Sequence, residues 1–245
     1  MRENFYKNYS EFYSSGISDD MSKVCSYYED DYRNILLKNK DAKIFDIGCG
    51  MGHFLYYLLK KGYHNIKGVD ICREQVNAAK KLVSADIQKI SDLKSYLSKS
   101  TETFDVITMN DVLEHLDKKE IIEVLGEVKN KLNPSGIFIC RVPNMSNIFG
   151  IYLLYNDFTH EIGFTEHSIT QVLRSVGFED IAVYGNKTRI NSFWKKVLFN
   201  AAQRVFFSMI KLILAYIYMP GSRQPKIMTT FLIAVSAKSR LFNNE

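Results

Sequence analysis

The chain has 245 residues, 46% hydrophobic and 24% charged, a composition that excludes disordered, collagen-like and disulfide-scaffold proteins. One compact domain, with room for an elaboration, is expected for this length. The four cysteines, Cys25, Cys49, Cys72 and Cys140, contain no C-x-x-C pair, and the N-terminal segment lacks the apolar core of a signal peptide. We therefore expect a protein of the reducing cytoplasm.

The net charge of +5 is distributed unevenly. From residue 187 to the end, ten Lys and Arg residues stand against a single acid, Glu245, which makes a local charge of +9. The first 186 residues carry −4. A basic end on a mildly acidic body indicates an anionic partner, either nucleic acid or lipid headgroups.

Short β-rich runs alternate with helical patterns from about residue 43 to residue 184, which is typical of βαβ units and a mostly parallel sheet. Two helix starts are visible in detail. Asp117 with Glu120 three residues later resembles a capping box, and Thr165 is a good N-cap. The strands are predicted at residues 43–47, 66–70, 84–87 (the weakest), 104–109, 136–142, 181–184 and 229–237.

The most informative segment is residues 43–62, which predicts a buried strand, a glycine-rich turn and an amphipathic helix. Gly48, Gly50 and Gly52 allow a sharp turn and a close approach of the backbone to a ligand at the helix N-terminus. Asp46 lies at the end of the strand. A nucleotide-like cofactor fits this arrangement.

Two acids follow the turn at informative distances. Asp70 closes the second strand, where a carboxylate can accept hydrogen bonds from both hydroxyls of a ribose. Asp86 follows sixteen residues later and would accept a hydrogen bond from an adenine amino group, with Ile87 as an apolar wall for the ring.

The run Asp46-x-Gly-x-Gly-x-Gly, then Asp70, Asp86 and Asn110-Asp-Val-Leu-Glu-His115, resembles class I S-adenosylmethionine-dependent methyltransferases over about residues 40–185. This resemblance implies an α/β, Rossmann-like fold: a seven-stranded sheet with its last strand antiparallel and helices on both faces. It implies S-adenosylmethionine as cofactor and S-adenosylhomocysteine as product. The cofactor-binding residues that it implies are Asp46, Gly48, Cys49, Gly50, Gly52, Asp70, Ile71, Asp86, Ile87 and Asn110.

The same glycines also suggest a nicotinamide dinucleotide site, whose fingerprint is G-x-G-x-x-G. In this chain the spacing is G-x-G-x-G, and His53 stands where the third glycine of that fingerprint belongs. A glycine turn with no ligand would require all three acids, Asp46, Asp70 and Asp86, to be in place by chance. The methyltransferase interpretation is therefore preferred.

Methyl transfer needs an acceptor aligned for in-line displacement, and a base if the acceptor is a hydroxyl. The base is expected beyond the carboxyl ends of the strands, in residues 110–115 or 143–165. His160 is the first candidate, because an unperturbed pKa of about 6.5 suits proton transfer near neutrality. Asp157 or Glu161 would orient it.

The catalytic candidates also have structural alternatives. His115, a further catalytic candidate, and Glu114 are as well suited to capping and packing between a strand and the next helix. Asp157 is also suited to forming a turn with its own backbone. Asp157, His160 and Glu161 would offer ligands to a divalent ion, but they lack a recognised ligand spacing, so no metal is expected.

A narrower resemblance covers residues 141–165. The segment Arg141-Val-Pro-Asn144, Gly150 and then Asp157-Phe-Thr-His-Glu-x-x-Phe-Thr165 is similar to bacterial methyltransferases of glycan and lipopolysaccharide assembly. It implies a hydroxyl of a saccharide, in a lipid-linked or cell-surface glycan precursor, as acceptor. A quinone precursor or another aromatic lipid is the alternative acceptor, and a non-catalytic cofactor-binding scaffold is a further alternative. Nucleic acid is disfavoured, because aromatic and basic residues do not interleave along a strand.

Residues 193–219 contain no glycine or proline and predict one long helix. Basic residues interrupt its apolar sequence, so we expect it to lie on a surface rather than to span a bilayer. A membrane surface is one partner for its apolar face; packing on the catalytic domain or a homodimer interface is the other. The expected location is accordingly the cytoplasm, peripheral on the inner membrane face.

These features divide the chain into four parts. An N-terminal helical lid (1–40) precedes the cofactor-binding core (41–186). A basic amphipathic helical insertion (187–228) and the last strand with its tail (229–245) follow. In the lid, Tyr9 and Tyr13 are candidates for closing over the cofactor.

Overall fold

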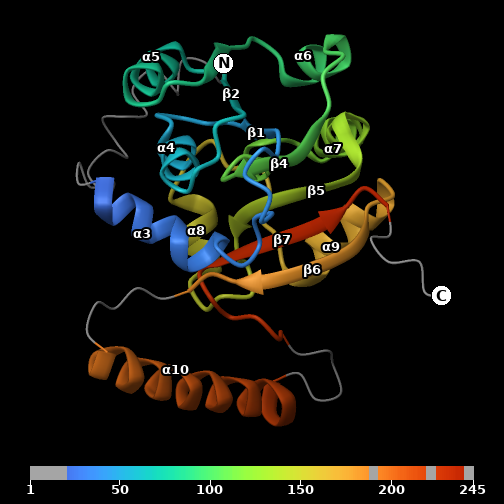
Figure 1. Cartoon of the computed structure of the whole chain (residues 1–245). Coiled ribbons are helices and arrows are strands. Elements are labelled where there is room, and N and C mark those ends of the chain that lie inside the picture. The colour runs from blue at the N-terminus through green and yellow to red at the C-terminus, as the bar shows by residue number, and fades with distance from the viewer. Residues whose placement is uncertain (1–20, 188–192, 219–224, 240–245) are drawn as a thin grey trace, which may run out of the picture.

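The computed structural model describes residues 21–187, 193–218 and 225–239, and within them seven strands form one sheet (Figure 1). The strands are β1 (Ile44–Ile47), β2 (Ile66–Asp70), β3 (Asp86–Lys89), β4 (Phe104–Asn110), β5 (Leu132–Pro143), β6 (Glu179–Gly185) and β7 (Phe231–Ala237). Their order is β3-β2-β1-β4-β5-β7-β6, and β7 runs antiparallel to both of its neighbours. The predicted Rossmann-like sheet with an antiparallel last strand is confirmed.

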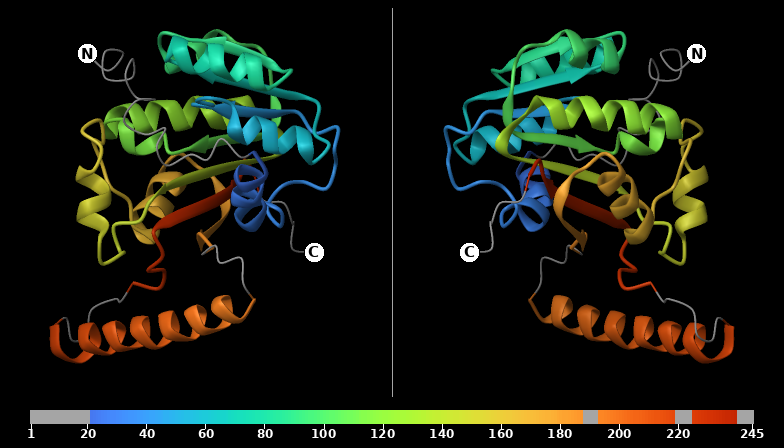
Figure 2. Two further views of the ribbon diagram at one scale, coloured as in Figure 1. Left: turned by 90° about the vertical axis from the view of Figure 1, so that its left-hand side faces the viewer. Right: turned by 90° about the vertical axis from the view of Figure 1, so that its right-hand side faces the viewer.

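Helices cover both faces of the sheet (Figures 1 and 2). One hydrophobic core joins the sheet to α3, α4 and α5, and a second core on the other face joins it to α6, α7 and α9. The helices are α3 (Met21–Tyr32), α4 (His53–Lys60), α5 (Arg73–Leu82), α6 (Leu93–Lys99), α7 (Lys118–Lys131), α8 (Gly150–Tyr155), α9 (Glu166–Ser175) and α10 (Phe193–Ile213), with a 3-10 turn η2 (Leu113–His115) and a π-helical turn η3 (Leu214–Tyr218).

The two cores follow from the alternation of side chains along each strand. In β1, Phe45 and Ile47 enter the core under α6, α7 and α9, while Ile44 enters the core under α3, α4 and α5. Successive residues of a strand face opposite sides of the sheet, so a strand covered on both faces is apolar throughout. The exception in β1 is Asp46, which is buried among apolar neighbours.

The two predicted helix starts are confirmed. The Asp117 side chain accepts a hydrogen bond from the backbone N–H of Glu120, and the Glu120 side chain accepts one from the backbone of Asp117. This reciprocal pair starts α7 immediately after the loop that leaves β4. Thr165 caps α9 in the same way through the backbone N–H of Ser168.

α10 lies between β6 and β7 in the chain and apart from the sheet in space (Figures 1 and 2). The predicted helix is confirmed from Phe193 and continues as η3 to Tyr218. Among the described residues, Val197–Ile217 is the one helical segment that is long and apolar enough to cross a membrane, with a mean hydropathy of 1.5 and none of it buried. Length and composition alone are weak evidence for a span. The lid candidates Tyr9 and Tyr13 lie outside the described residues.

Candidate active site

The glycine-rich turn connects the end of β1 to the start of α4. Gly48, Gly50 and Gly52 all have positive φ, of 72°, 52° and 82°. This left-handed backbone strongly favours glycine. A Cβ atom at Gly48 would lie 2.4 Å from Cγ2 of Val112, so the turn is also pressed against the segment that follows β4.

Asp70 lies at the end of β2 and holds the turn through its carboxylate. Oδ2 accepts a hydrogen bond from the backbone N–H of Gly50 at 2.9 Å, and Oδ1 accepts one from Cys72 at 2.8 Å. Burial raises the pKa of Asp70, and these N–H groups oppose the rise. The acid predicted to bind a ribose therefore lies against the predicted turn, at the carboxyl edge of the sheet.

Asp46 lies in β1 just before the turn and is buried. The Thr108 hydroxyl donates a hydrogen bond to Oδ1 of Asp46 at 2.6 Å. Burial raises the pKa of Asp46 to about 7, and the nearby Asp70 adds to the rise. A positively charged ligand next to the turn would favour the ionised form of Asp46.

Asn110 ends β4 at the same edge. Its Oδ1 accepts a hydrogen bond from the Tyr32 hydroxyl, which brings α3 to the site. The buried Nδ2 of Asn110 has no hydrogen-bond partner among the described residues. Asn110 is predicted from the sequence for this site, whereas Tyr32, which lies 78 positions away in the chain, is not.

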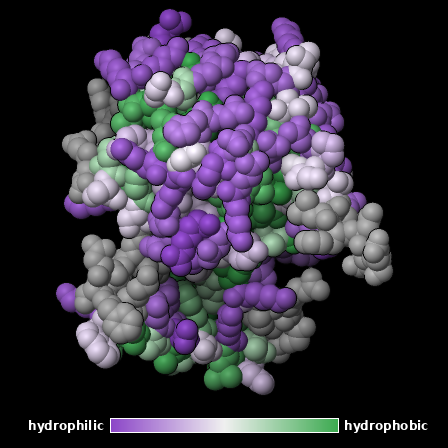
Figure 3. Space-filling view, viewed as in Figure 1, coloured by the Kyte–Doolittle hydropathy of each residue, from purple (hydrophilic) through white to green (hydrophobic). Residues whose placement is uncertain are grey.

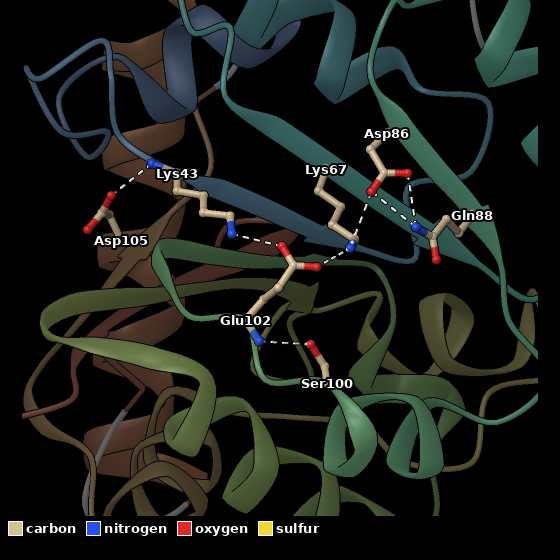
Figure 4. A network of polar contacts seen from close by, with 7 residues as sticks. All are labelled: Lys43, Lys67, Asp86, Gln88, Ser100, Glu102 and Asp105. Carbon is tan, nitrogen blue, oxygen red and sulfur yellow. Dashed lines mark hydrogen bonds and ion pairs between the residues drawn. The ribbon is translucent and has the colours of Figure 1, made fainter.

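Asp86 and Ile87 lie away from this edge, so the prediction that they frame an adenine ring was wrong. β3 runs over 86–89 rather than 84–87, and Asp86 pairs in register with Lys67 at the far end from Asp70. Asp86 forms an ion pair with Lys67 at 3.2 Å and accepts hydrogen bonds from Gln88 (Figure 4). Ile87 is buried in a hydrophobic core.

The two loops predicted to carry the catalytic base meet next to the turn. Glu114 and His115 lie in η2 and are buried. The backbone N–H groups of Glu161 and Ile162 donate to the carbonyl oxygen of Glu114, at 2.8 and 3.2 Å. The rings of His115 and His160 lie edge to face with centroids 4.8 Å apart.

The hydrogen bonds of His115 determine which ring nitrogen carries a proton. Its Nδ1 lies 2.8 Å from Oγ1 of Thr159, and that hydroxyl donates to Oδ1 of Asp157 at 2.7 Å. Because Thr159 gives its single proton to Asp157, it accepts one from His115. In the neutral ring, we infer, Nδ1 of His115 is protonated and Nε2 carries the lone pair.

His160 has the same tautomer for a different reason. Its Nδ1 lies 3.1 Å from the carbonyl oxygens of both Leu153 and Leu154 in α8. Carbonyl oxygens only accept hydrogen bonds, so Nδ1 carries the proton. The prediction that Asp157 or Glu161 orients His160 was therefore wrong: α8 orients His160, Asp157 acts on His115, and the Glu161 side chain is exposed.

An ion pair that sequence analysis did not identify borders the site. Nε of Arg141 donates to Oδ1 of Asp111 at 3.1 Å, and Asp111 has a positive φ of 55°. The guanidinium of Arg141 lies over the rings of Tyr27 and Phe231, at 4.9 and 4.7 Å from their centroids. These contacts connect α3, β5 and β7 around the segment that follows β4.

Three features of this chain are compared with known proteins: the glycine turn, the acid that ends the second strand, and the strand order 3-2-1-4-5-7-6. A family model described as a methyltransferase domain matches residues 22–183. The chain belongs to this family.

The curated relatives of this chain are named for transfer to different atoms. It is 29% identical over 103 residues to a phosphoethanolamine N-methyltransferase of Plasmodium falciparum, covering 41% of this chain and 39% of that one. It is 30% identical over 92 residues to a mitochondrial ubiquinone biosynthesis O-methyltransferase of Candida albicans, covering 35% and 28%. The chain thus spans less than half the length of these two curated relatives.

Solved structures share the fold of this chain over nearly its whole length. A SAM-dependent methyltransferase from Archaeoglobus fulgidus superposes with a TM-score of 0.64 at 19% identity, covering 95% of this chain and 99% of that one. The magnesium protoporphyrin IX methyltransferase of Synechocystis, solved with bound SAM, has a TM-score of 0.59 at 15% identity, covering 97% and 95%. The predicted fold is confirmed, and the expected cofactor agrees with the ligand of that structure.

Proposed function

We propose that this methyltransferase transfers the methyl group of S-adenosylmethionine to a hydroxyl of a saccharide in a lipid-linked or cell-surface glycan precursor. The observation that carries the proposal is the pair of rings of His115 and His160, 4.8 Å apart between centroids on the loops that follow β4 and β5. Their Nδ1 contacts leave the lone pair, by our inference, at Nε2 of each ring. A sugar hydroxyl is weakly acidic and must lose its proton during transfer. The two imidazoles support this loss of the hydroxyl proton, either by accepting the proton at Nε2 or by binding an ion that makes the hydroxyl more acidic.

The cofactor's place follows from the glycine turn. The turn and the α4 N-terminus would take the nucleoside, with Asp70 on the ribose and Asn110 near the methionine part. The Asp46 carboxyl beneath the turn would favour the positive charge of the donor. In the transfer, the acceptor oxygen bonds to the methyl carbon while the carbon–sulfur bond breaks, which leaves S-adenosylhomocysteine.

A hollow of about 480 Å³ beside α8 is the proposed acceptor site. It is lined by Phe149, Tyr152 and Leu153, together with Asn147 and Thr230, and the carbonyl of Leu153 holds His160. Aromatic faces of this kind can pack against a sugar ring. They suit a quinone precursor or another aromatic lipid as well, and such an acceptor is the second candidate.

The environment of α10 supports an acceptor that is presented at a membrane, on its cytoplasmic side. The described side chains of α10 include exposed Trp194, Leu198 and Phe206, and Figure 3 shows hydrophobic side chains over this helix. Lys195 and Arg204 are exposed on the same helix. An interfacial helix buries apolar side chains near the headgroups while its basic residues contact anionic lipids.

Incubation with radiolabelled S-adenosylmethionine and separated glycan, lipid and RNA fractions tests the proposal. Label is expected in lipid-linked saccharide, and the Asp70→Ala variant is expected to transfer little. Label confined to quinone-type lipids would establish the second candidate instead. Label confined to RNA, or cofactor binding with no label in any fraction, would overturn the proposed function and, in the last case, favour a non-catalytic scaffold.

A further inference from the structure

We propose that Glu114, His115 and His160 bind a divalent transition-metal ion. One potential ligand atom from each residue lies within 4.8 Å of the others. Bonds of about 2.0–2.2 Å to nitrogen and oxygen place neighbouring ligand atoms roughly 3–4 Å apart, so small side-chain rotations would close the site. Two imidazoles and one carboxylate are ligands that such ions accept, with coordination positions left open.

The contacts behind the two histidines match those of metal ligands. A metal-binding histidine almost always donates its other ring N–H to a carboxylate, a carbonyl or a water, which aligns the ring. His160 donates from Nδ1 to the carbonyl oxygens of α8 at 3.1 Å. His115 donates from Nδ1 to Thr159, which is in turn hydrogen-bonded to Asp157. Nε2 is therefore the nitrogen through which each ring would bind the ion.

The carboxyl group of Glu114 supplies an independent reason for a cation. Its side chain is buried, and Oε2 has no hydrogen-bond partner among the described residues. Asp111 and Asp157 lie close enough to repel its charge. The guanidinium of Arg141 is engaged with Asp111. Burial of a carboxylate oxygen without a hydrogen-bond partner is unfavourable, and a bound cation would both satisfy Oε2 and favour the ionised form of Glu114.

The sequence suggested Asp157, His160 and Glu161 as possible metal ligands. The site proposed here differs from that group, because Asp157 supports His115 instead of binding the ion. If the proposed function is correct, the acceptor hydroxyl would occupy an open position on the ion. The ion would lower the pKa of that hydroxyl, and its proton would pass to water. The resulting alkoxide oxygen would then bond to the methyl carbon as the carbon–sulfur bond breaks, so charge and atoms balance.

Calorimetric titration of chelator-treated full-length protein with Zn²⁺ tests binding without any substrate, and Co²⁺ absorption bands report imidazole ligation. We expect one ion per chain. Glu114→Gln and His160→Ala are expected to weaken binding at least tenfold, whereas His167→Ala, at an exposed position of α9, serves as the matched control. No ion bound by the wild type, or equal affinity in His160→Ala, would overturn the proposal.

Thr159→Val keeps all three ligands and removes only the support of His115. Loss of such an outer contact typically weakens metal binding 10- to 100-fold, and we expect an effect in that range. Because no ligand is changed, this variant provides a second test should Glu114→Gln fail to fold. Unchanged Zn²⁺ affinity in folded Thr159→Val would contradict the role assigned to the hydrogen-bond chain.

The metal site and the proposed function can fail separately. If Zn²⁺ binds but no saccharide is labelled, the site stands and the proposed acceptor is wrong. If saccharide is labelled equally by chelator-treated and metal-loaded protein, the acceptor stands and the ion has no part in the transfer.

Discussion

Thr108 in β4 donates a hydrogen bond to Asp46 in β1 over 2.6 Å, and the two residues are register partners in the sheet. Both side chains are buried, and Asp46 lies in the strand that leads into the glycine turn. A carboxyl group with its pKa raised to about 7 thus lies where the fold and the cofactor site meet. The ionisation of Asp46 therefore affects both the stability of the sheet and the binding of a positively charged ligand.

Asp46 is expected to make the cofactor-free protein less stable as the pH rises from about 4 to about 7. Its pKa is raised from 3.8 to about 7, so in this window the folded chain holds a proton that the unfolded chain has released. The contribution to the free energy of unfolding falls by up to about 1.4 kcal/mol per pH unit. Urea unfolding at several pH values should show a shallower fall in Asp46→Asn. An identical slope in the variant would contradict the raised pKa.

Asp70→Ala is expected to weaken S-adenosylmethionine binding by about 10- to 100-fold, as for the loss of hydrogen bonds to a charged group. Titration calorimetry measures the affinity. The control is Asp86→Ala, which lies at the opposite end of the strand pair and should bind normally. Undiminished affinity in folded Asp70→Ala would contradict the proposed contact between Asp70 and the ribose. An equal loss of affinity in Asp86→Ala would contradict the register of β3.

Gly48→Ala is expected to destabilise the fold more than Gly62→Ala and to abolish cofactor binding. Both glycines have positive φ, which costs an alanine roughly 1–2 kcal/mol. Only at Gly48 would the new Cβ also meet Val112, at 2.4 Å, whereas nothing lies within 4 Å at Gly62. Thermal unfolding compares the two variants. A second substitution, Val112→Ala, should restore part of the stability, and equal melting temperatures for the two single variants would argue against the clash.

The wild-type protein is expected to float with anionic vesicles at low salt if α10 lies on membranes. Near such a surface each basic residue contributes about 1 kcal/mol, so Lys195→Gln with Arg204→Gln should weaken binding roughly 30-fold. Lys94→Gln in α6 is the control. A wild type that stays in the bottom fraction would remove the membrane proposal, and sedimentation as a dimer would favour a homodimer interface for α10.

Local sequence patterns determined most of the fold. Alternating and continuous apolar runs predicted the strands, since the burial of a strand is encoded in its own residues. Asp117 and Thr165 marked helix starts because a cap needs only the three residues that follow it. Gly48, Gly50 and Gly52 marked the turn because their positive φ is a property of single residues.

Tertiary structure alone decided which side chains meet. The register of β3 depends on pairing with β2, and a shift of two residues moved Asp86 from the predicted site to Lys67. His115 reaches Thr159 across 44 positions, and Tyr32 reaches Asn110 across 78. A local pattern extends over a few residues, whereas contacts at this separation depend on how the whole sheet and its loops pack together.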